Sequence, residues 1–173
     1  MESRNRITKY VLTAVFAAMV FVATIVLQIS IPATGGYINL GDVVIILAAW
    51  TLGGVFGGVA GGIGAGLVDL IMFPVYAPAT VVIKFIMGLV AGLIMRRGQT
   101  KKAKIIATAL GTFVCEAIMI LGYLIYEGII LGLGKAAVIG IAGNAIQGGV
   151  SVVVGLALVS ILYKTKLNKF IDR

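Results

Sequence analysis

Long apolar runs alternate along the chain with short polar, glycine- or proline-containing connections, a pattern typical of membrane-spanning helices. The runs are interrupted at Pro32 and the Gly35–Gly36 pair, between Pro74 and Pro78, and at the Arg96–Arg97 pair. A transmembrane helix needs about 20 mostly apolar residues. The pattern therefore predicts six spans. The second is short, and the sequence leaves open whether it crosses the membrane fully or is partly re-entrant. The predicted spans cover residues 10–29, 38–50, 53–72, 80–95, 105–126 and 136–163.

Composition supports a membrane protein. Hydrophobic residues make up 61% of the chain and charged residues 12%, and the mean hydropathy is +1.15. A soluble domain carries about 25% charged residues, so this chain cannot cover its surface with polar groups. Six spans leave only loops and tails, and we expect residues 1–173 to form one domain, an all-α bundle of six transmembrane helices.

The basic residues predict how this bundle is oriented. Three precede the first span, five join the fourth and fifth, and four follow the sixth, so 12 of the 14 basic residues fall on one side. Lys and Arg accumulate in cytoplasmic loops, which places both termini in the cytoplasm. The net charge of +8 then reflects topology, and we expect no nucleic-acid partner. The three clusters are Arg4, Arg6 and Lys9; Arg96, Arg97, Lys101, Lys102 and Lys104; and Lys164, Lys166, Lys169 and Arg173.

Small residues gather in two places. The third span carries overlapping glycine columns, for example Gly53, Gly57 and Gly61. Small residues four apart let transmembrane helices approach closely, so the columns predict packing inside the monomer, with a homodimer seam or a partner surface as the alternative. The first span carries a smaller patch that could pack within the fold or dock another membrane subunit. It consists of Ala14, Ala17 and Ala18.

Polar residues within the spans concentrate toward the predicted extracellular side. Ionisable groups in a membrane are costly and mark functional sites. Lys84 lies about one turn into the fourth span, Tyr123 lies two turns outward from Glu116 on one face, and Asn144 and Gln147 share a face of the sixth span. The inner halves hold little beyond hydroxyl groups. This distribution predicts a cup open to the outside, with the loops of residues 31–39 and 73–78 as lid and rim.

Several acids have simpler interpretations. Asp42 could cap the second helix, because carboxylates favour helix amino termini, and Asp69 could pair with Lys84 as a structural bridge. Asn144 and Gln147 could simply cross-link helices. We expect Glu127 to lie in a solvated outer loop with Lys135. Glu116 is the strongest functional candidate of the acids, because it is deepest and has no base nearby in the sequence.

The chain lacks the residues that common cofactors and catalysts require. It contains no histidine and a single cysteine, Cys115, which argues against a zinc, haem or iron–sulfur site. No G-K-[ST] follows the glycine-rich segment, so no phosphate-binding loop is present. We find no nucleophile–base pair and expect neither an enzyme nor a cofactor.

Four motifs resemble the substrate-binding S components of energy-coupling factor (ECF) vitamin transporters. They are Tyr37–Asp42 (YINLGD), Gly66–Leu70 (GLVDL), Tyr76–Thr80 (YAPAT) and Lys84 followed by Met87-Gly88. The resemblance covers nearly the whole chain and is greatest to the branch that contains riboflavin, hydroxymethylpyrimidine and pyridoxine binders. It implies a multi-pass protein of a prokaryotic plasma membrane that captures a vitamin from outside.

The resemblance also implies partners and a binding site. An S component docks through an alanine motif on its first helix, here Ala14-x-x-x-Ala18, onto a transmembrane coupling (T) subunit that joins two ATPases. Its pocket uses the first outer loop and the outer ends of helices four to six. The predicted ligand-binding residues are Tyr37, Asn39, Tyr76, Lys84, Glu116, Tyr123, Asn144 and Gln147. Trp50 is expected near the cytoplasmic face, so tyrosine or phenylalanine must supply any stacking surface.

The leading hypothesis is therefore the high-affinity substrate-binding subunit of an ATP-driven importer. A hydroxymethylpyrimidine- or pyridoxine-like compound suits the expected mixture of donors and acceptors best, and riboflavin comes next. An autonomous secondary transporter that couples to protons through Glu116 is the alternative. An intramembrane enzyme is a third class, which the missing catalytic groups disfavour.

Overall fold

A computed structural model describes residues 2–98 and 100–164 as six helices and one small β-hairpin. The predicted all-helical bundle is confirmed except for the hairpin. Five of the helices are long and apolar enough to cross a membrane, and the second is not. The predicted cytoplasmic basic residues Lys166, Lys169 and Arg173 lie outside the described residues. The elements are α1 (Glu2–Val26), β1 (Ile29–Ile31), β2 (Gly36–Ile38), α2 (Gly41–Leu52), α3 (Gly54–Met72), α4 (Ala77–Met95), α5 (Lys101–Ile125), the π-helical turn η1 (Tyr126–Ile130) and α6 (Lys135–Lys164).

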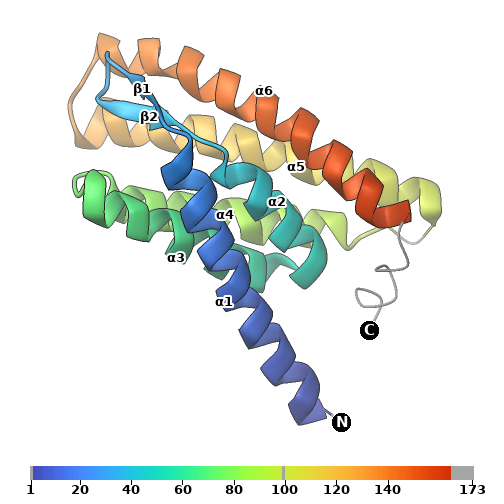
Figure 1. Cartoon of the computed structure of the whole chain (residues 1–173). Helices are drawn as coiled ribbons and strands as arrows, with labels where there is room; N and C mark the ends of the chain where they lie inside the picture. The colour runs from blue at the N-terminus through green and yellow to red at the C-terminus, as the bar shows by residue number, and fades with distance from the viewer. Residues whose placement is uncertain (1, 99, 165–173) are drawn as a thin grey trace.

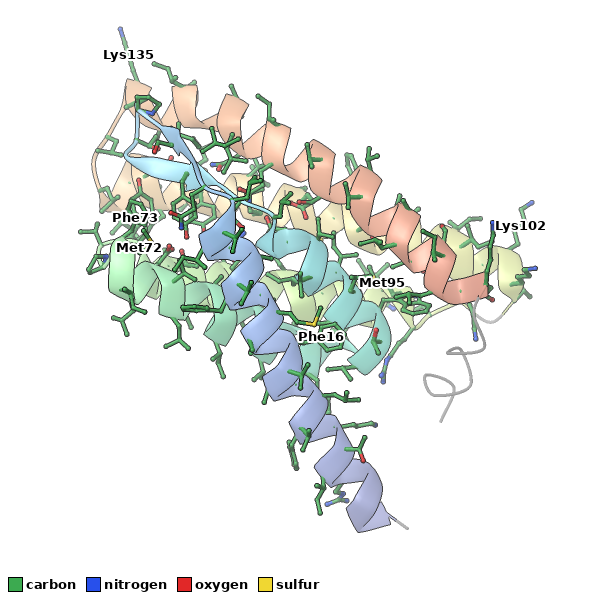
Figure 2. All side chains as sticks on the ribbon, in the orientation of Figure 1. Phe16, Met72, Phe73, Met95, Lys102 and Lys135 are labelled. Carbon is green, nitrogen blue, oxygen red and sulfur yellow. The ribbon has the colours of Figure 1, made fainter. Side chains whose placement is uncertain are left out.

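The bundle has two distinct ends (Figure 1). The start of α1, the end of α4, the start of α5 and the end of α6 lie toward one end, and the hairpin and the α3–α4 connection lie toward the other. Lys102 and Lys135 mark these opposite ends in Figure 2. This arrangement is the one expected if the basic clusters share a membrane face. The hairpin end is called the outer end below, following the predicted topology.

The short helix α2 occupies only the inner part of the bundle. Its 12 residues extend about 18 Å at 1.5 Å per residue, well short of the roughly 30 Å hydrocarbon core. Its first turn is level with Lys84, because Asp42 contacts that side chain, and its last carbonyl, of Leu52, accepts a hydrogen bond from Arg96 at the end of α4. The space above α2 is left to the hairpin.

The hairpin follows directly from the end of the first apolar run. Ile29 pairs with Ile38 and Ile31 with Gly36 in antiparallel register. The turn between the strands contains Pro32 and Gly35, whose φ of +75° lies in the left-handed region that glycine tolerates best. The sequence predicted a loop here, and the structure corrects this to a two-stranded ribbon that packs against the outer end of α6 (Figure 1).

Glycines bring α3 into close contact with α4. A Cβ atom on Gly88 would lie 2.5 Å from the carbonyl carbon of Gly57, and one on Gly92 would lie 2.3 Å from the amide nitrogen of Gly54. The predicted glycine columns therefore pack inside the monomer. Gly57 also faces the backbone of Ala49 on α2, so α3 joins two neighbours at backbone distance.

Apolar side chains close the inner half of the bundle. A buried cluster contains Ile46 and Ala49 of α2, Met87 of α4, and Cys115 and Met119 of α5. Trp50 packs against this cluster, near the inner end as predicted. The polar residues of the cup lie on the outer side of this apolar layer.

Candidate functional site

A small polar cavity lies beneath the hairpin, where the outer ends of the helices converge. Its volume is about 30 Å³, enough for a few water molecules at most, since a single water needs roughly 10–15 Å³ by this measure. In this conformation the side chains that line the cavity fill most of it. Its lining consists of Thr24, Ile31, Gly36, Tyr37, Asn39, Ala65, Asp69, Tyr76, Thr80, Lys84, Tyr123, Glu127, Asn144 and Gln147.

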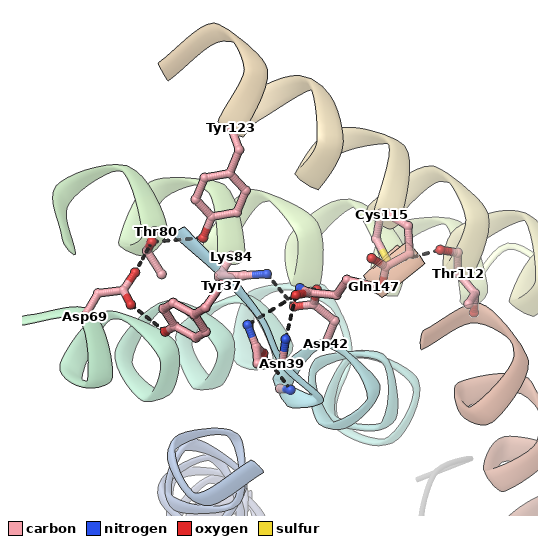
Figure 3. A network of polar contacts seen from close by, with 12 residues as sticks. Tyr37, Asn39, Asp42, Asp69, Thr80, Lys84, Thr112, Cys115, Tyr123 and Gln147 are labelled. Atoms are coloured by element: carbon pink, nitrogen blue, oxygen red, sulfur yellow. Dashed lines mark hydrogen bonds and ion pairs between the residues drawn. The ribbon is translucent and has the colours of Figure 1, made fainter. Parts of the chain in front are cut away.

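An ion pair forms the floor of the cavity. The Lys84 Nζ atom of α4 lies 2.5 Å from the Asp42 carboxylate of α2, and both side chains are buried. Gln147 of α6 donates to the other Asp42 oxygen at 2.5 Å and accepts the backbone NH of Asn39 at 2.8 Å. Figure 3 shows these four groups converging from three helices and the segment after β2. The network ties the hairpin to the floor.

A second network forms the wall on the α3–α4 side (Figure 3). The Tyr37 hydroxyl donates to the Asp69 carboxylate at 2.5 Å, and the Thr80 hydroxyl donates to the other oxygen of the same group. Thr80 in turn lies 2.9 Å from the Tyr123 hydroxyl. The Lys84 Nζ atom lies over the Tyr123 ring, 5.5 Å from the ring centroid. A cation over an aromatic face is stabilised by the ring quadrupole.

Aromatic rings surround the rim, as expected for a pocket without tryptophan. Tyr37 stacks on Phe73 with ring centroids 4.8 Å apart, and Tyr76 packs against Tyr123 and Tyr126 at 6.4 and 5.9 Å. Burial, followed by the nearby charge of Asp69, raises the pKa of the Tyr37 hydroxyl. Burial and Glu127 raise the pKa of Tyr76 to about 12. Both hydroxyls therefore remain protonated donors at physiological pH.

Glu127 lies inside the site, not in a solvated loop. Its side chain is 3% exposed, and the Tyr76 hydroxyl approaches its Oε1 atom at 3.3 Å. The π-helical turn η1 continues α5 past Tyr126 and carries this carboxylate toward the hairpin. The expectation of a solvated Glu127 is wrong, whereas Lys135, expected beside it, is exposed.

Three buried side chains reach the cavity with hydrogen-bonding capacity to spare. Thr24 Oγ1 and Glu127 Oε2 have no hydrogen-bond partner in the described part of the chain. Asn144 is 6% exposed, and no side-chain hydrogen bond joins it to a described residue. Buried polar groups are nearly always satisfied by protein or ordered water. These groups therefore provide attachment points for water or for a ligand.

Seven of the eight residues predicted to bind a ligand line this cavity, and one does not. Glu116 lies deeper, next to Gly148 and 3.8 Å from the Cys115 thiol. Its Oε2 atom is buried without a partner among the described residues. The structure thus separates Glu116 from the cavity and places the Asp42–Lys84 pair in the floor itself.

Two simpler interpretations of the acids are not supported by the geometry. Asp42 makes no capping hydrogen bond at α2; the Asn39 side chain accepts the Gly41 NH instead, at 2.8 Å. Lys84 pairs with Asp42, whereas Asp69 accepts from two hydroxyl groups. The suggested Asp69–Lys84 bridge is therefore not formed.

Sequence reasoning missed several residues of the lining, among them Thr24, Thr80 and Glu127. Asp69 was recognised as an acid near the outer surface but was not assigned to the site. For Thr80 the available signal was its position one turn before Lys84 on α4. For Thr24 no pattern distinguishes a cavity-facing threonine from one that bonds its own helix. In the described part of the chain no cluster of three or more acidic, His or Cys side chains could hold a metal ion.

The alanine patch of α1 borders a separate apolar groove. The groove lies between α1 and α3 and has a volume of about 890 Å³. Ala14 and Ala18 are exposed, and Ala17 is half-buried. The backbone of Ala17 packs closely against α3, since a Cβ atom added to Gly64 would lie 2.4 Å from the Ala17 carbonyl oxygen. Ala17 thus packs within the fold while its two neighbours face outward.

Comparisons with known proteins agree with this architecture. Residues 4–164 match the family described as "ECF-type riboflavin transporter, S component". A protein of Pyrococcus woesei described as "Uncharacterized protein in gap 3'region" is 37% identical over 145 residues, which cover 84% of this chain and 95% of that protein. The family match extends from α1 to the end of α6 and so includes the hairpin, the cavity and the α1 groove. The chain therefore belongs to the ECF-type riboflavin transporter S components, a family of membrane transporter subunits and not of enzymes.

Proposed function

We propose that this protein captures a small water-soluble vitamin or vitamin precursor at its outer end and delivers it to an ATP-driven importer. The observation that carries this proposal is the small polar cavity at the outer end, which lies above a buried apolar layer. Such an arrangement can hold a ligand from one side without forming a continuous pore, which would require polar lining at all depths. Family membership supports vitamin transport as the general activity.

The cavity is too small in this conformation for a vitamin, so binding must displace part of its wall. The hairpin is the element best suited to move. It has only two short strands, and an isolated two-stranded ribbon is marginally stable. It is attached to the floor through Asn39 and Gln147. It is attached to the wall through Tyr37 and through the Thr34 carbonyl, which accepts a hydrogen bond from the Tyr76 hydroxyl at 2.8 Å. In our proposal the hairpin lifts to admit the ligand and closes over it.

The lining favours a ligand of one or two heteroaromatic rings with several polar substituents. Tyr37, Tyr76 and Tyr123 offer aromatic faces, and Asn144 offers an amide with both a donor and an acceptor. A hydroxymethylpyrimidine- or pyridoxine-like compound fits this set, with riboflavin as the larger alternative. Asn39, Lys84 and Gln147 would support the site through their network, and Glu116 would act only through the nearby floor.

Delivery requires partners that this chain does not contain. We propose that Ala14 and Ala18, facing the α1–α3 groove, dock on a T subunit that carries two ATPases. Small side chains let a partner helix approach closely in lipid. The competing hypothesis, a proton-coupled transporter centred on Glu116, is not favoured by the family and predicts pH-dependent uptake into vesicles that contain this protein alone.

The test is mass spectrometry of small molecules extracted from the protein purified in detergent without partners. We expect a near-stoichiometric vitamin or precursor, lost on unfolding and regained on refolding with a vitamin panel. The Asn144→Ala variant should bind the recovered compound about tenfold or more weakly, because a buried polar contact is worth roughly 1–3 kcal/mol. Val153→Ala, on the lipid-facing side of the same helix, is the matched control.

A protein that is empty and that no vitamin stabilises would overturn the proposed function. Equal affinity of the Asn144→Ala variant and the control would instead preserve the function and remove Asn144 from the site.

A further inference from the structure

Glu127 is the one acid of the lining with an oxygen left unpartnered in the described part of the chain. Oε1 is approached by the Tyr76 hydroxyl at 3.3 Å, and Thr34 of the hairpin turn lies beside the carboxylate. No hydrogen bond of acceptable geometry reaches Oε2. Leaving a buried charged acceptor unpaired costs more than the roughly 1–3 kcal/mol of a neutral group. The fold therefore tolerates a local instability at this position.

A glycine on α6 leaves room for the Glu127 carboxylate. Gly140 of α6 faces the carboxylate, and a Cβ atom there would lie 2.9 Å from Oε2 and 2.8 Å from the Thr34 methyl group. No basic side chain contacts Glu127 among the described residues. The Oε2 atom, which lacks a hydrogen-bond partner among the described residues, thus lies where the hairpin, η1 and α6 meet.

The lining of the cavity contains one basic side chain, Lys84, and two acidic side chains, Asp69 and Glu127. Lys84 supplies the positive charge of the lining, and Asp42 below it already neutralises that charge at 2.5 Å. Asp69 is hydrogen-bonded by two hydroxyl groups, one on each oxygen. The hydroxyl groups of Tyr76 and Thr34 lie beside Glu127, but its Oε2 atom has no hydrogen-bond partner among the described residues. Two carboxylates therefore line the cavity without a cation of their own in the described structure. An anionic ligand would be repelled, and a ligand with an N–H donor would be attracted.

We propose that Glu127 is a specificity-determining residue that accepts a hydrogen bond from an amino group of the ligand. The ligand class is then an amino-bearing, non-phosphorylated heteroaromatic compound. This inference rests on the proposed function and narrows it. An amino group placed between Glu127 Oε2 and Asn144 supplies the donor that the carboxylate lacks. A phosphorylated ligand is excluded, because Asp69 and Glu127 would repel the negative charges of its phosphate group.

The test compares matched ligands by thermal shift and calorimetry on the full chain in detergent. The probes are 4-amino-5-hydroxymethyl-2-methylpyrimidine, the same compound without its amino group, its phosphate ester, and the pair pyridoxamine and pyridoxine, with riboflavin as the larger compound. We expect the amino member of at least one pair to bind about tenfold or more tightly than its partner, as a charge-assisted hydrogen bond requires. The phosphate ester should not bind.

The Glu127→Gln variant separates recognition from a structural role. It keeps the shape and removes the charge, so we expect the amino compound to lose most of its advantage while the compound without the amino group binds as before. The empty variant should melt at a higher temperature than the wild type, because an unpaired buried charge has been removed. A purely structural carboxylate would give the opposite shift. Lys135→Gln, an exposed residue at the same end, controls for overall charge.

Two results would overturn the inference while leaving the proposed function intact. One is tight binding of riboflavin, pyridoxine or the phosphate ester that Glu127→Gln does not change. The other is equal affinity within both matched pairs. If no vitamin or precursor stabilises the wild type, the inference and the proposed function both fail.

Discussion

The Lys84–Asp42 pair shows how one contact sets the depth of the site. Lys84 is 2% exposed and Asp42 is 0% exposed, so neither charge is exposed to bulk solvent. Removing one partner of a buried ion pair costs about 3–5 kcal/mol, whereas replacing both is often far less costly. The pair therefore acts as a unit in the floor of the cavity.

This coupling gives a prediction about stability. Lys84→Met and Asp42→Asn should each lower the free energy of unfolding by about 3–5 kcal/mol, and the double variant should lose clearly less than the sum. Thermal or denaturant unfolding in detergent measures the coupling. Additive losses would show that Lys84 and Asp42 do not depend on each other.

Residue-level contacts were only partly predictable. The sequence placed Asp42, Asp69 and Lys84 near the outer side, because the apolar runs fix depth. It suggested Asp69 as the partner of Lys84, and this was wrong, because depth says nothing about which face of a neighbouring helix a side chain occupies. The network of Gln147 with Asn39 also depends on the path of the hairpin, which brings together residues 108 positions apart.

At the scale of elements, the helices were predictable and their ends were not. Apolar runs of sufficient length predict α3 and α6 within a few residues. The hairpin was not predicted because strands of three residues are too short to show an alternation of apolar and polar side chains. Glu127 was missed because the fifth span was ended at Tyr126, whereas the π-helical turn η1 carries the helix onward.

The contact between α3 and α4 makes a sharp prediction about glycine. Gly88→Ala should strongly destabilise the protein, since its Cβ would lie 2.5 Å from the backbone of Gly57 and one helix must move. Gly149→Ala in α6 is the control, because a Cβ there meets nothing within 4 Å. In a helix, alanine is favoured over glycine by roughly 1 kcal/mol, so the control should be neutral or more stable. Melting temperatures of the two variants decide this, and equal values would contradict the packing described.

At the scale of the whole molecule, the proposed capture site and the proposed docking surface lie in different parts of the bundle. The cavity lies above the short helix α2, and the α1–α3 groove borders the alanine patch on the flank of the bundle. α1 crosses the bundle obliquely and its amino-terminal part projects away from it (Figure 1). Many of its side chains are exposed, including Tyr10 at 62% and Val22 at 54%. A large apolar surface of this kind is available to lipid or to a membrane partner.

The separation predicts a variant that binds but does not transport. Ala14→Trp should fill the groove mouth and block assembly with the T subunit, while ligand affinity measured on the isolated chain stays within about twofold, since the site lies elsewhere. Val153→Trp, on the exposed face of α6, is the matched control for a bulky residue in lipid. Copurification with the T subunit and uptake in cells are the measurements. Normal uptake by Ala14→Trp would remove the alanine patch from the docking surface.

The π-helical turn has a consequence for how such a binding site can change its chemistry. A π-helical turn accommodates one extra residue in a helix, and each residue of an α-helix turns the chain by about 100°. Deleting Tyr126, the first residue of this turn, would restore the α-helical register and rotate Glu127 and the later side chains of the turn about the helix axis. Glu127 would then leave the cavity although no amino acid had been substituted. Relatives that differ by one residue in the length of this turn are therefore expected to differ in the cargo they recognise.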